Sequence, residues 1–136
     1  MTVTRKPSLF SGERKTARAT ASIVQGSGRT WINGIPIELL TPEVAKERIL
    51  TPLMLAGDLK EKVDIHVKVL GGGFMSRAEA SAIAISRALV NWFKNGELKQ
   101  RIVEFDKHLI SGDPRQVEPK KFGGPGSRRR KQKSYR

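Results

Sequence analysis

Cysteine is absent from this 136-residue chain. Its absence excludes a disulfide framework, a cysteine-ligated zinc or iron–sulfur site and a thiol nucleophile. Long apolar runs are also missing, because no stretch approaches the roughly 18 residues that a membrane-spanning helix requires. Arg5 and Lys6 are not followed by the apolar segment that a secretory signal would have. We therefore expect a soluble, cytoplasmic protein with no membrane partner.

Side chains suited to catalysis or metal binding are scarce. The chain has two histidines, His66 and His108, and neither has an acid or a nucleophile at the spacing of a known motif. The carboxylates of the central region are scattered rather than clustered, whereas acid–base or metal chemistry would need them close together. The sequence therefore predicts no catalytic residue, no metal site and no cofactor.

Three consecutive glycines, residues 71–73, precede a predicted helix. Amides at a helix N-terminus attract anions, and Arg77 would add a positive charge there. The segment nevertheless lacks both the Gly-Lys-Ser/Thr of a P-loop and the GxGxxG of a dinucleotide site. A tight turn between strand and helix is the simpler interpretation; if a phosphate binds here, RNA backbone is a better candidate than a nucleotide.

Positive charge is abundant but unevenly distributed. The chain has a net charge of +13, and such an excess usually serves to meet a polyanion. Residues 114–136 hold nine Lys or Arg and one Glu, a net charge of +8, and residues 1–18 hold five and one, a net charge of +4. The central residues 19–113 are left with +1. The charge pattern therefore indicates a nearly neutral body with basic extremities.

The last 23 residues carry no helical or strand periodicity. Prolines at 114, 119 and 125 and glycines at 123, 124 and 126 favour an extended segment that cannot bury enough apolar surface to fold alone. Fully extended, it would reach about 75 Å. Its arginines and lysines are suited to binding phosphates. We interpret it as an RNA-binding arm; the alternative is a solubility or localisation tail, for which Phe122, Tyr135 and the Gly-Gly-Pro-Gly segment would be surplus.

Alternation of residues predicts the strands of an α+β body. Small and apolar residues at every second position predict strands at 16–23 and 63–70. The Asn33-Gly34 dipeptide predicts a hairpin between short strands at 31–32 and 35–39. His66 falls on the polar face of its strand, exposed or facing RNA. The role of Trp31, in the core or stacked on a base, stays open.

Three helices are predicted to pack on this sheet. The first runs from 43 to about 50 with Thr41 as its side-chain cap, and Pro52 allows at best a kinked continuation that Gly57 ends. The second begins at a capping box of Ser76 and Glu79 and runs to about Phe93. The third covers 97–106. We therefore divide the chain into a flexible N-terminal segment at 1–11, a globular domain at 12–113 and the basic arm at 114–136.

Five motifs together resemble one known family. They are Gly12-Glu13-Arg14-Lys15-Thr16-Ala17; the triple glycine with Ser86-Arg87-Ala88-Leu89 in the helix that follows; Asp113-Pro114-Arg115 with Glu118; Lys120-Lys121-Phe122-Gly123-Gly124-Pro125-Gly126; and the ending Gln132-Lys133-Ser134-Tyr135-Arg136. This set resembles the universal small-subunit ribosomal protein family S-nine, whose eukaryotic members are called S-sixteen. The Gly-Gly-Pro-Gly segment and the Lys-Ser-Tyr-Arg ending are typical of archaeal or eukaryotic members. Arg77 departs from the family's usual glutamine.

The resemblance implies a fold, a location and binding partners. Family members have an α/β two-layer fold like domain 2 of ribosomal protein S-five, with a four-stranded sheet and helices packed on it. They lie in the head of the small subunit, on the 3′ major domain of its rRNA and beside other head proteins. Their arm passes through rRNA and ends at the anticodon stem-loop of peptidyl-site tRNA.

Carried onto this sequence, the resemblance implies two sets of contact residues. The tRNA-binding tip would be Lys133, Ser134, Tyr135 and Arg136. The rRNA-binding residues would be Arg14, Lys15, Arg18, Arg115, Lys120, Lys121, Arg128, Arg129, Arg130 and Lys131.

Two other functions compete with this interpretation. One is a different basic RNA-binding protein, such as an assembly factor or a nucleoid-type protein. The other is an RNA-processing nuclease that uses the triple-glycine loop. A nuclease would need a cluster of acid–base or metal-binding carboxylates, which the sequence does not offer, so a structural ribosomal protein is the function we expect.

Overall fold

Five strands form one mixed sheet in the computed structural model, which describes residues 6–134. The strands are β1 (Ser8–Arg14), β2 (Ala17–Gln25), β3 (Thr30–Ile32), β4 (Ile35–Pro36) and β5 (Val63–Leu70). Their order across the sheet is β1-β2-β5-β3-β4. All neighbouring pairs are antiparallel except β3 and β5, which run parallel. The fold class is α+β as expected, but the sheet has five strands rather than four.

The additional strand is β1, which corrects the prediction of a flexible segment at 1–11. Ser8 to Ser11 pair with β2 in register, and residues 1–5 lie outside the described part of the chain. The core face of β1 is made by Phe10 and Gly12. Because a buried glycine contributes no apolar side chain, the alternation that marks a strand is hidden in the sequence.

The two long strands follow the predicted alternation. One side of each is buried, and the buried residues are Ala17, Ala19, Ala21 and Ile23 in β2 and Val63, Ile65, Val67 and Val69 in β5. The Asn33-Gly34 turn joins β3 to β4 as expected, with positive φ at both residues. The strand predicted through Leu39 stops at Pro36, and a 3₁₀ turn, η1 (Ile37–Leu39), follows. Pro36 has no N–H to extend the ladder.

The first helix, α1 (Glu43–Ala56), is longer and more regular than predicted. Pro52 lies inside it and is buried, so packing against the core offsets the cost of the missing hydrogen bond. Thr41 is not its cap: Pro42 occupies that position without a side-chain hydrogen bond. Gly57 ends the helix as expected, and the 3₁₀ segment η2 (Gly57–Lys62) leads into β5.

The long helix, α2 (Phe74–Phe93), begins two residues before the predicted capping box. Gly73 occupies the cap position, and neither Ser76 nor Glu79 forms the box; Glu79 is instead drawn to Arg14 of β1. The helix ends at Phe93 as predicted. Asn95 caps the next helix, α3 (Gly96–Phe105), through its side chain, and a short helix, α4 (His108–Ser111), completes the body.

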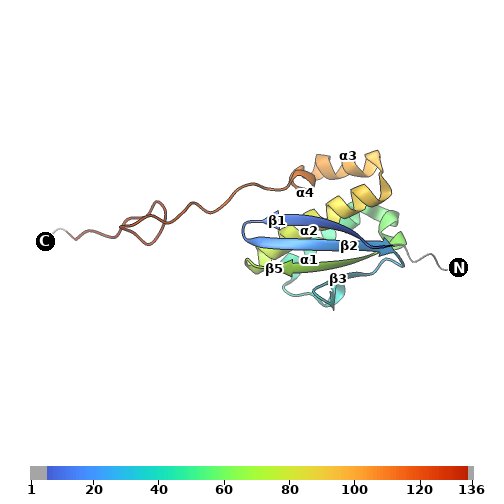
Figure 1. The fold of residues 1–136 in the computed structure, drawn as a ribbon, viewed down its shortest axis with the longest axis horizontal. Coiled ribbons are helices and arrows are strands. Elements are labelled where there is room, and N and C mark those ends of the chain that lie inside the picture. The colour runs from blue at the N-terminus through green and yellow to red at the C-terminus, as the bar shows by residue number, and fades with distance from the viewer. Residues whose placement is uncertain (1–5, 135–136) are drawn as a thin grey trace.

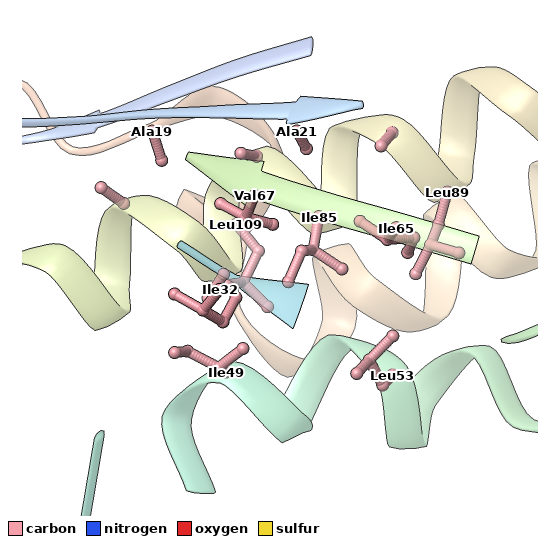
Figure 2. Packing of buried hydrophobic residues seen from close by; sticks show 14 of the residues in the cluster. Ala19, Ala21, Ile32, Ile49, Leu53, Ile65, Val67, Ile85, Leu89 and Leu109 are labelled. Atoms are coloured by element: carbon pink, nitrogen blue, oxygen red, sulfur yellow. The ribbon is translucent and has the colours of Figure 1, made fainter. Parts of the chain in front are cut away.

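The helices lie on one face of the sheet and leave the other face open (Figure 1). Apolar side chains of β2, β5, α1 and α2 meet between the two layers, as Figure 2 shows around Ile85 and Leu89 of α2. Fully burying one such side chain contributes about 1.5–3 kcal/mol. Alanines on α2 allow it to pack closely on the sheet. This packing fixes where β1, α2 and α4 end, and therefore where the arm begins.

Beyond Gly112 the described chain has no helix or strand, and it extends far from the body (Figure 1). Among residues 6–134, no helix combines the length and apolar character needed to cross a membrane.

Candidate nucleic-acid interface

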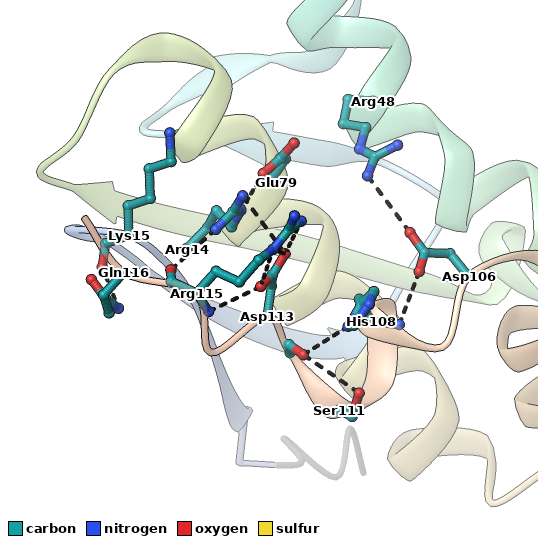
Figure 3. Close-up of polar contacts among 11 residues, drawn as sticks. Arg14, Lys15, Arg48, Glu79, Asp106, His108, Ser111, Asp113, Arg115 and Gln116 are labelled. Carbon is teal, nitrogen blue, oxygen red and sulfur yellow. Dashed lines mark hydrogen bonds and ion pairs between the residues drawn. The ribbon is translucent and has the colours of Figure 1, made fainter. Parts of the chain in front are cut away.

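The arm begins at a cluster of ion pairs centred on Arg14, the last residue of β1 (Figure 3). Its Nε donates to Glu79 Oε2 of α2 at 2.7 Å, and its second guanidinium nitrogen lies 3.6 Å from Asp113 Oδ2. Its remaining nitrogen donates to the backbone oxygen of Arg115 at 3.3 Å. The Arg14 side chain is 13% exposed. One guanidinium thus joins a strand, a helix and the first residues of the arm.

Asp113 is the second centre of the cluster. Its carboxylate accepts hydrogen bonds from the Arg115 guanidinium, the shortest 2.7 Å, and from the Arg115 backbone N–H at 3.0 Å. The Arg115 side chain is the main reason that the pKa of Asp113 lies far below its ordinary value, and the Arg115 N–H adds to the effect. Asp113 is therefore ionised at neutral pH, and its carboxylate pairs with both arginines.

Arg87 of α2 joins β1 to α4, the helix that directly precedes the arm. Its Nε donates to the Ile110 carbonyl of α4 at 2.8 Å, and another of its nitrogens donates to the Ser11 carbonyl of β1 at 2.8 Å. Gln116 reaches back to the carbonyl of Lys15 at 3.3 Å. Together with Arg14, these contacts set the direction in which residues 112–116 leave the body. We call residues 112–116 the arm root.

Further along, the arm closes a loop on itself (Figure 1). Glu118 accepts a 2.7 Å hydrogen bond from Arg128 Nε and a 3.2 Å bond from a second guanidinium nitrogen of Arg128. The Lys131 N–H donates to the Gly123 carbonyl at 2.9 Å. The Arg128 guanidinium is the main reason that the pKa of Glu118 is lowered. We call residues 118–131 the arm loop.

Glycine is required at two places in the arm loop. Gly123 has a φ of +87°, a conformation that residues with a Cβ rarely adopt. Gly124 lies so close to the Arg129 carbonyl that a side chain would collide with it. The Gly-Gly-Pro-Gly segment is therefore a turn with a defined shape rather than a generic spacer.

Comparison with known proteins identifies the family of this chain. The model of the family described as ribosomal protein S9/S16 matches residues 12–136, which include the end of β1, the other four strands, all the helices and the whole arm. The chain belongs to the ribosomal protein S9/S16 family. This family is one of structural, non-enzymatic proteins, in agreement with the absence of catalytic motifs from the sequence.

Two archaeal relatives of this S9/S16 family chain match it over nearly its whole length. A small ribosomal subunit protein uS9 of Desulfurococcus amylolyticus is 56% identical over 128 residues, which cover 94% of this chain and 91% of the relative. A protein of the same name from Halobacterium salinarum is 48% identical over 127 residues, which cover 93% and 96%. Both place the chain in the archaeal or eukaryotic branch that the motifs indicated.

The structure sorts the basic residues of this S9/S16 protein into two groups. Arg14, Arg115 and Arg128 pair with carboxylates of the same chain. Other residues of the expected rRNA-binding set are exposed and form no ion pair within residues 6–134. They are Lys15, Lys120, Lys121, Arg129, Arg130 and Lys131. Arg18 is 81% exposed and lies 3.7 Å from Glu13. The sequence did not reveal the pairs of Arg14, because Glu79 and Asp113 are far from it along the chain. The pairs Asp113–Arg115 and Glu118–Arg128 are closer in sequence, but charge counts alone do not show which opposite charges meet.

The glycine turn of the family member is explained without a bound phosphate. Gly71 and Gly72 both have positive φ, and a Cβ on Gly71 would lie 2.6 Å from the Thr16 carbonyl. Arg77 Nε donates to the Gly71 carbonyl at 3.0 Å, so it closes the turn. The geometry favours the simpler interpretation, a tight strand-to-helix turn. Across the described range, no group of three or more candidate ligands could hold a metal ion.

Proposed function

We propose that this protein is a structural constituent of the small ribosomal subunit in the cytoplasm, where it binds rRNA of the head and contacts peptidyl-site tRNA through its arm. The observation that carries the proposal is a segment with a net charge of +8 that extends from a nearly neutral body at a root set by ion pairs. The names of the two archaeal relatives support assignment to the small subunit.

The arm's free cations are the proposed main rRNA contacts. Five exposed cations lie on the arm loop: Lys120 and Lys121 near its start, and Arg129, Arg130 and Lys131 at its end. Arginine binds phosphate through two parallel hydrogen bonds, and lysine supplies a point charge. Each neutralised phosphate releases condensed counterions, which drives binding at moderate salt. Lys15 and Arg18, in the β1–β2 turn and at the start of β2, extend this basic surface onto the body.

Arg14, Arg115 and Arg128 have a different place in the proposal. Their guanidinium groups already bind carboxylates of the chain, so contact with RNA requires them to share or exchange these partners. We propose that Arg14 and Arg115 act mainly by holding the arm root. The neighbouring head proteins and the 3′ major domain of the rRNA complete the proposed surroundings.

The tip of the arm, residues 133–136, is the proposed tRNA contact. Lys133 and Ser134 are exposed, whereas Tyr135 and Arg136 lie outside the described residues. The chemistry of the tip, with two cations, a hydroxyl and an aromatic ring, suits a nucleic-acid backbone and an unpaired base. The described arm extends far from the body (Figure 1), which suits contact with a ligand that the body does not itself touch.

Deleting residues 127–136 tests this function. We expect subunits that contain the shortened protein to assemble a normal head, because the body and the arm root are unchanged. We expect them to release peptidyl-site tRNA faster, because the proposed tRNA contact is missing. Sedimentation of the subunits measures assembly, and filter binding measures tRNA retention. Deletion of residues 133–136 alone separates the tip from the arm loop. Unchanged tRNA retention in both variants would contradict the role of the tip.

A further inference from the structure

The open face of the sheet carries a single row of side chains that crosses all the strands. In register, Leu9 of β1 lies beside Ser22 of β2, then His66 of β5, Trp31 of β3 and Pro36 of β4. None of the described helices covers this face (Figure 1). The row therefore faces outward, and its chemistry is available to a partner.

Two members of the row form an aromatic stack. The Trp31 and His66 rings lie 4.2 Å apart, measured between centroids, with an angle of 6° between their planes. Adjacent strands are separated by roughly 4.8 Å, so the distance between the two rings is close to the distance between the strands that carry them. His66 is exposed, and the side of its ring away from Trp31 is directed toward the neighbouring strand β2. The stack is therefore open at the His66 end.

On the side of His66 away from Trp31, the neighbouring residue of the row is Ser22 of β2, so no aromatic ring continues the stack there. Ser22 is too short to fill this position, and Leu9, which is 66% exposed, rises on the strand beyond. The result is a shallow hollow in which His66 and Leu9 lie on either side of Ser22, with Thr20 beside it. The hollow extends along β5 to Val67 and Lys68 and to Asn33 and Gly34 of the β3–β4 turn. Two strand spacings, about 9.6 Å, separate the backbones of His66 and Leu9, which leaves room for one flat ring between their side chains.

The charges around the hollow favour an anionic partner. Lys68 lines the hollow and has no ion pair in the described part of the chain. The acidic side chains of the same face are already engaged: Asp64 accepts hydrogen bonds from three backbone N–H groups of residues 27–29, and Glu13 lies 3.7 Å from Arg18. A phosphate near Lys68 would meet an unpaired ammonium group and no free carboxylate.

We propose that this hollow is a binding site for one unpaired RNA base, which stacks on His66 above Ser22 while its phosphate contacts Lys68. Aromatic side chains on an open sheet are a common platform for bases, since every base presents a π-face. The Ser22 and Thr20 hydroxyls can donate to or accept from the edge of the base. This inference rests on the proposed function, because it adds a base contact on the body to the phosphate contacts of the arm.

Ser22→Leu is the variant that tests the site, because it fills the hollow and leaves His66, Trp31 and Lys68 in place. Ser11→Leu is the matched control: the same change, on the same face, at a position that does not line the hollow. The probes are a single-stranded RNA of twelve nucleotides and an abasic strand of equal length and charge. We expect Ser22→Leu to weaken binding of the RNA by about tenfold, the scale of one stacked base, and to leave binding of the abasic strand unchanged.

A second measurement keeps the test valid if Ser22→Leu disturbs the fold. The His66 ring protons of the wild-type protein should move upfield in NMR spectra when RNA is added and stay in place with the abasic strand. His66→Ala should reproduce the loss of affinity.

The outcomes separate this site from the proposed function. Binding of both strands with no effect of Ser22→Leu and no shift at His66 would overturn the base site and leave the arm's function standing. Binding of neither strand would argue against the proposed function itself. If Ser22→Leu blocked entry into subunits without weakening RNA binding, the face would serve a protein neighbour and the base site would be wrong.

Discussion

Individual charges in this chain have different roles that composition does not separate. Arg14 and Arg18 each add one unit to the same basic count, yet the first is 13% exposed between two carboxylates and the second is 81% exposed. The sequence predicted both as rRNA contacts. It could not reveal the difference, because Arg14 is paired with a residue 65 positions away that only the fold brings near.

The difference in burial between Arg14 and Arg18 predicts that removing each charge has a different effect on stability. Arg14→Met keeps most of the apolar stem and removes the guanidinium from Glu79 and Asp113. We therefore expect the free energy of unfolding to fall by about 1.5–3 kcal/mol, the range for hydrogen bonds to charged groups. Amide exchange in the arm root should accelerate at the same time. Arg18→Met is the control and should change neither quantity measurably, because exposed ion pairs contribute little. Equal unfolding midpoints for the two variants, by urea titration, would show that Arg14 does not hold the root.

At the scale of elements, the predicted strands and helices were confirmed where periodicity was carried by side chains. The alternation in β2 and β5 and the end of α2 at Phe93 are examples. β1 was missed because its buried position is Gly12, where the close approach of α2 replaces a side chain. A Cβ on Gly12 would lie 2.5 Å from the Ala80 carbonyl and 2.7 Å from the Ala84 nitrogen. The predicted helix start at the Ser76 box was wrong: α2 begins at Phe74 with Gly73 at the cap position, and Glu79 binds Arg14.

The tight contact at Gly12 predicts the cost of enlarging it. Gly12→Val should separate β1 from α2 and lower the free energy of unfolding by about 1–3 kcal/mol, as overpacking of a core does. Ser11→Val places the same side chain on the open face of the same strand, where we expect little change. Thermal unfolding followed by circular dichroism would measure both. If Gly12→Val were as stable as Ser11→Val, the close packing of α2 on β1 would not be a constraint.

For the whole molecule, the division into a nearly neutral body and a basic arm was predictable from charge alone. The sequence could not predict that the arm would be tied to the body and looped on itself, because those features depend on pairs such as Arg14 with Asp113 and Glu118 with Arg128. The candidate site was therefore predicted as a set of residues, and the structure supplied its geometry.

This division predicts how salt acts on RNA binding. Removing residues 127–136 deletes six cations, and each lost phosphate contact should reduce the slope of log affinity against log salt by about 0.7–0.9. Neutralising Lys94, Lys99, Arg101 and Lys107 around α3, by change to glutamine, is the control and should alter the slope much less. Titrations of a small-subunit rRNA fragment at several salt concentrations would measure it. Equal slopes would mean that residues 127–136 do not supply phosphate contacts.

The arm loop also shortens the distance that the arm spans from the body. Because Lys131 is hydrogen bonded to Gly123, the chain between them adds almost nothing to the distance that the arm spans. Drawn straight, the eight residue-to-residue steps from Gly123 to Lys131 would span roughly 26 Å. The Glu118–Arg128 pair that helps close the loop is exposed and can be opened by a competing anion at modest cost. The arm therefore has a fixed root and a loop that can open, and opening the loop would let the same segment reach farther from the body.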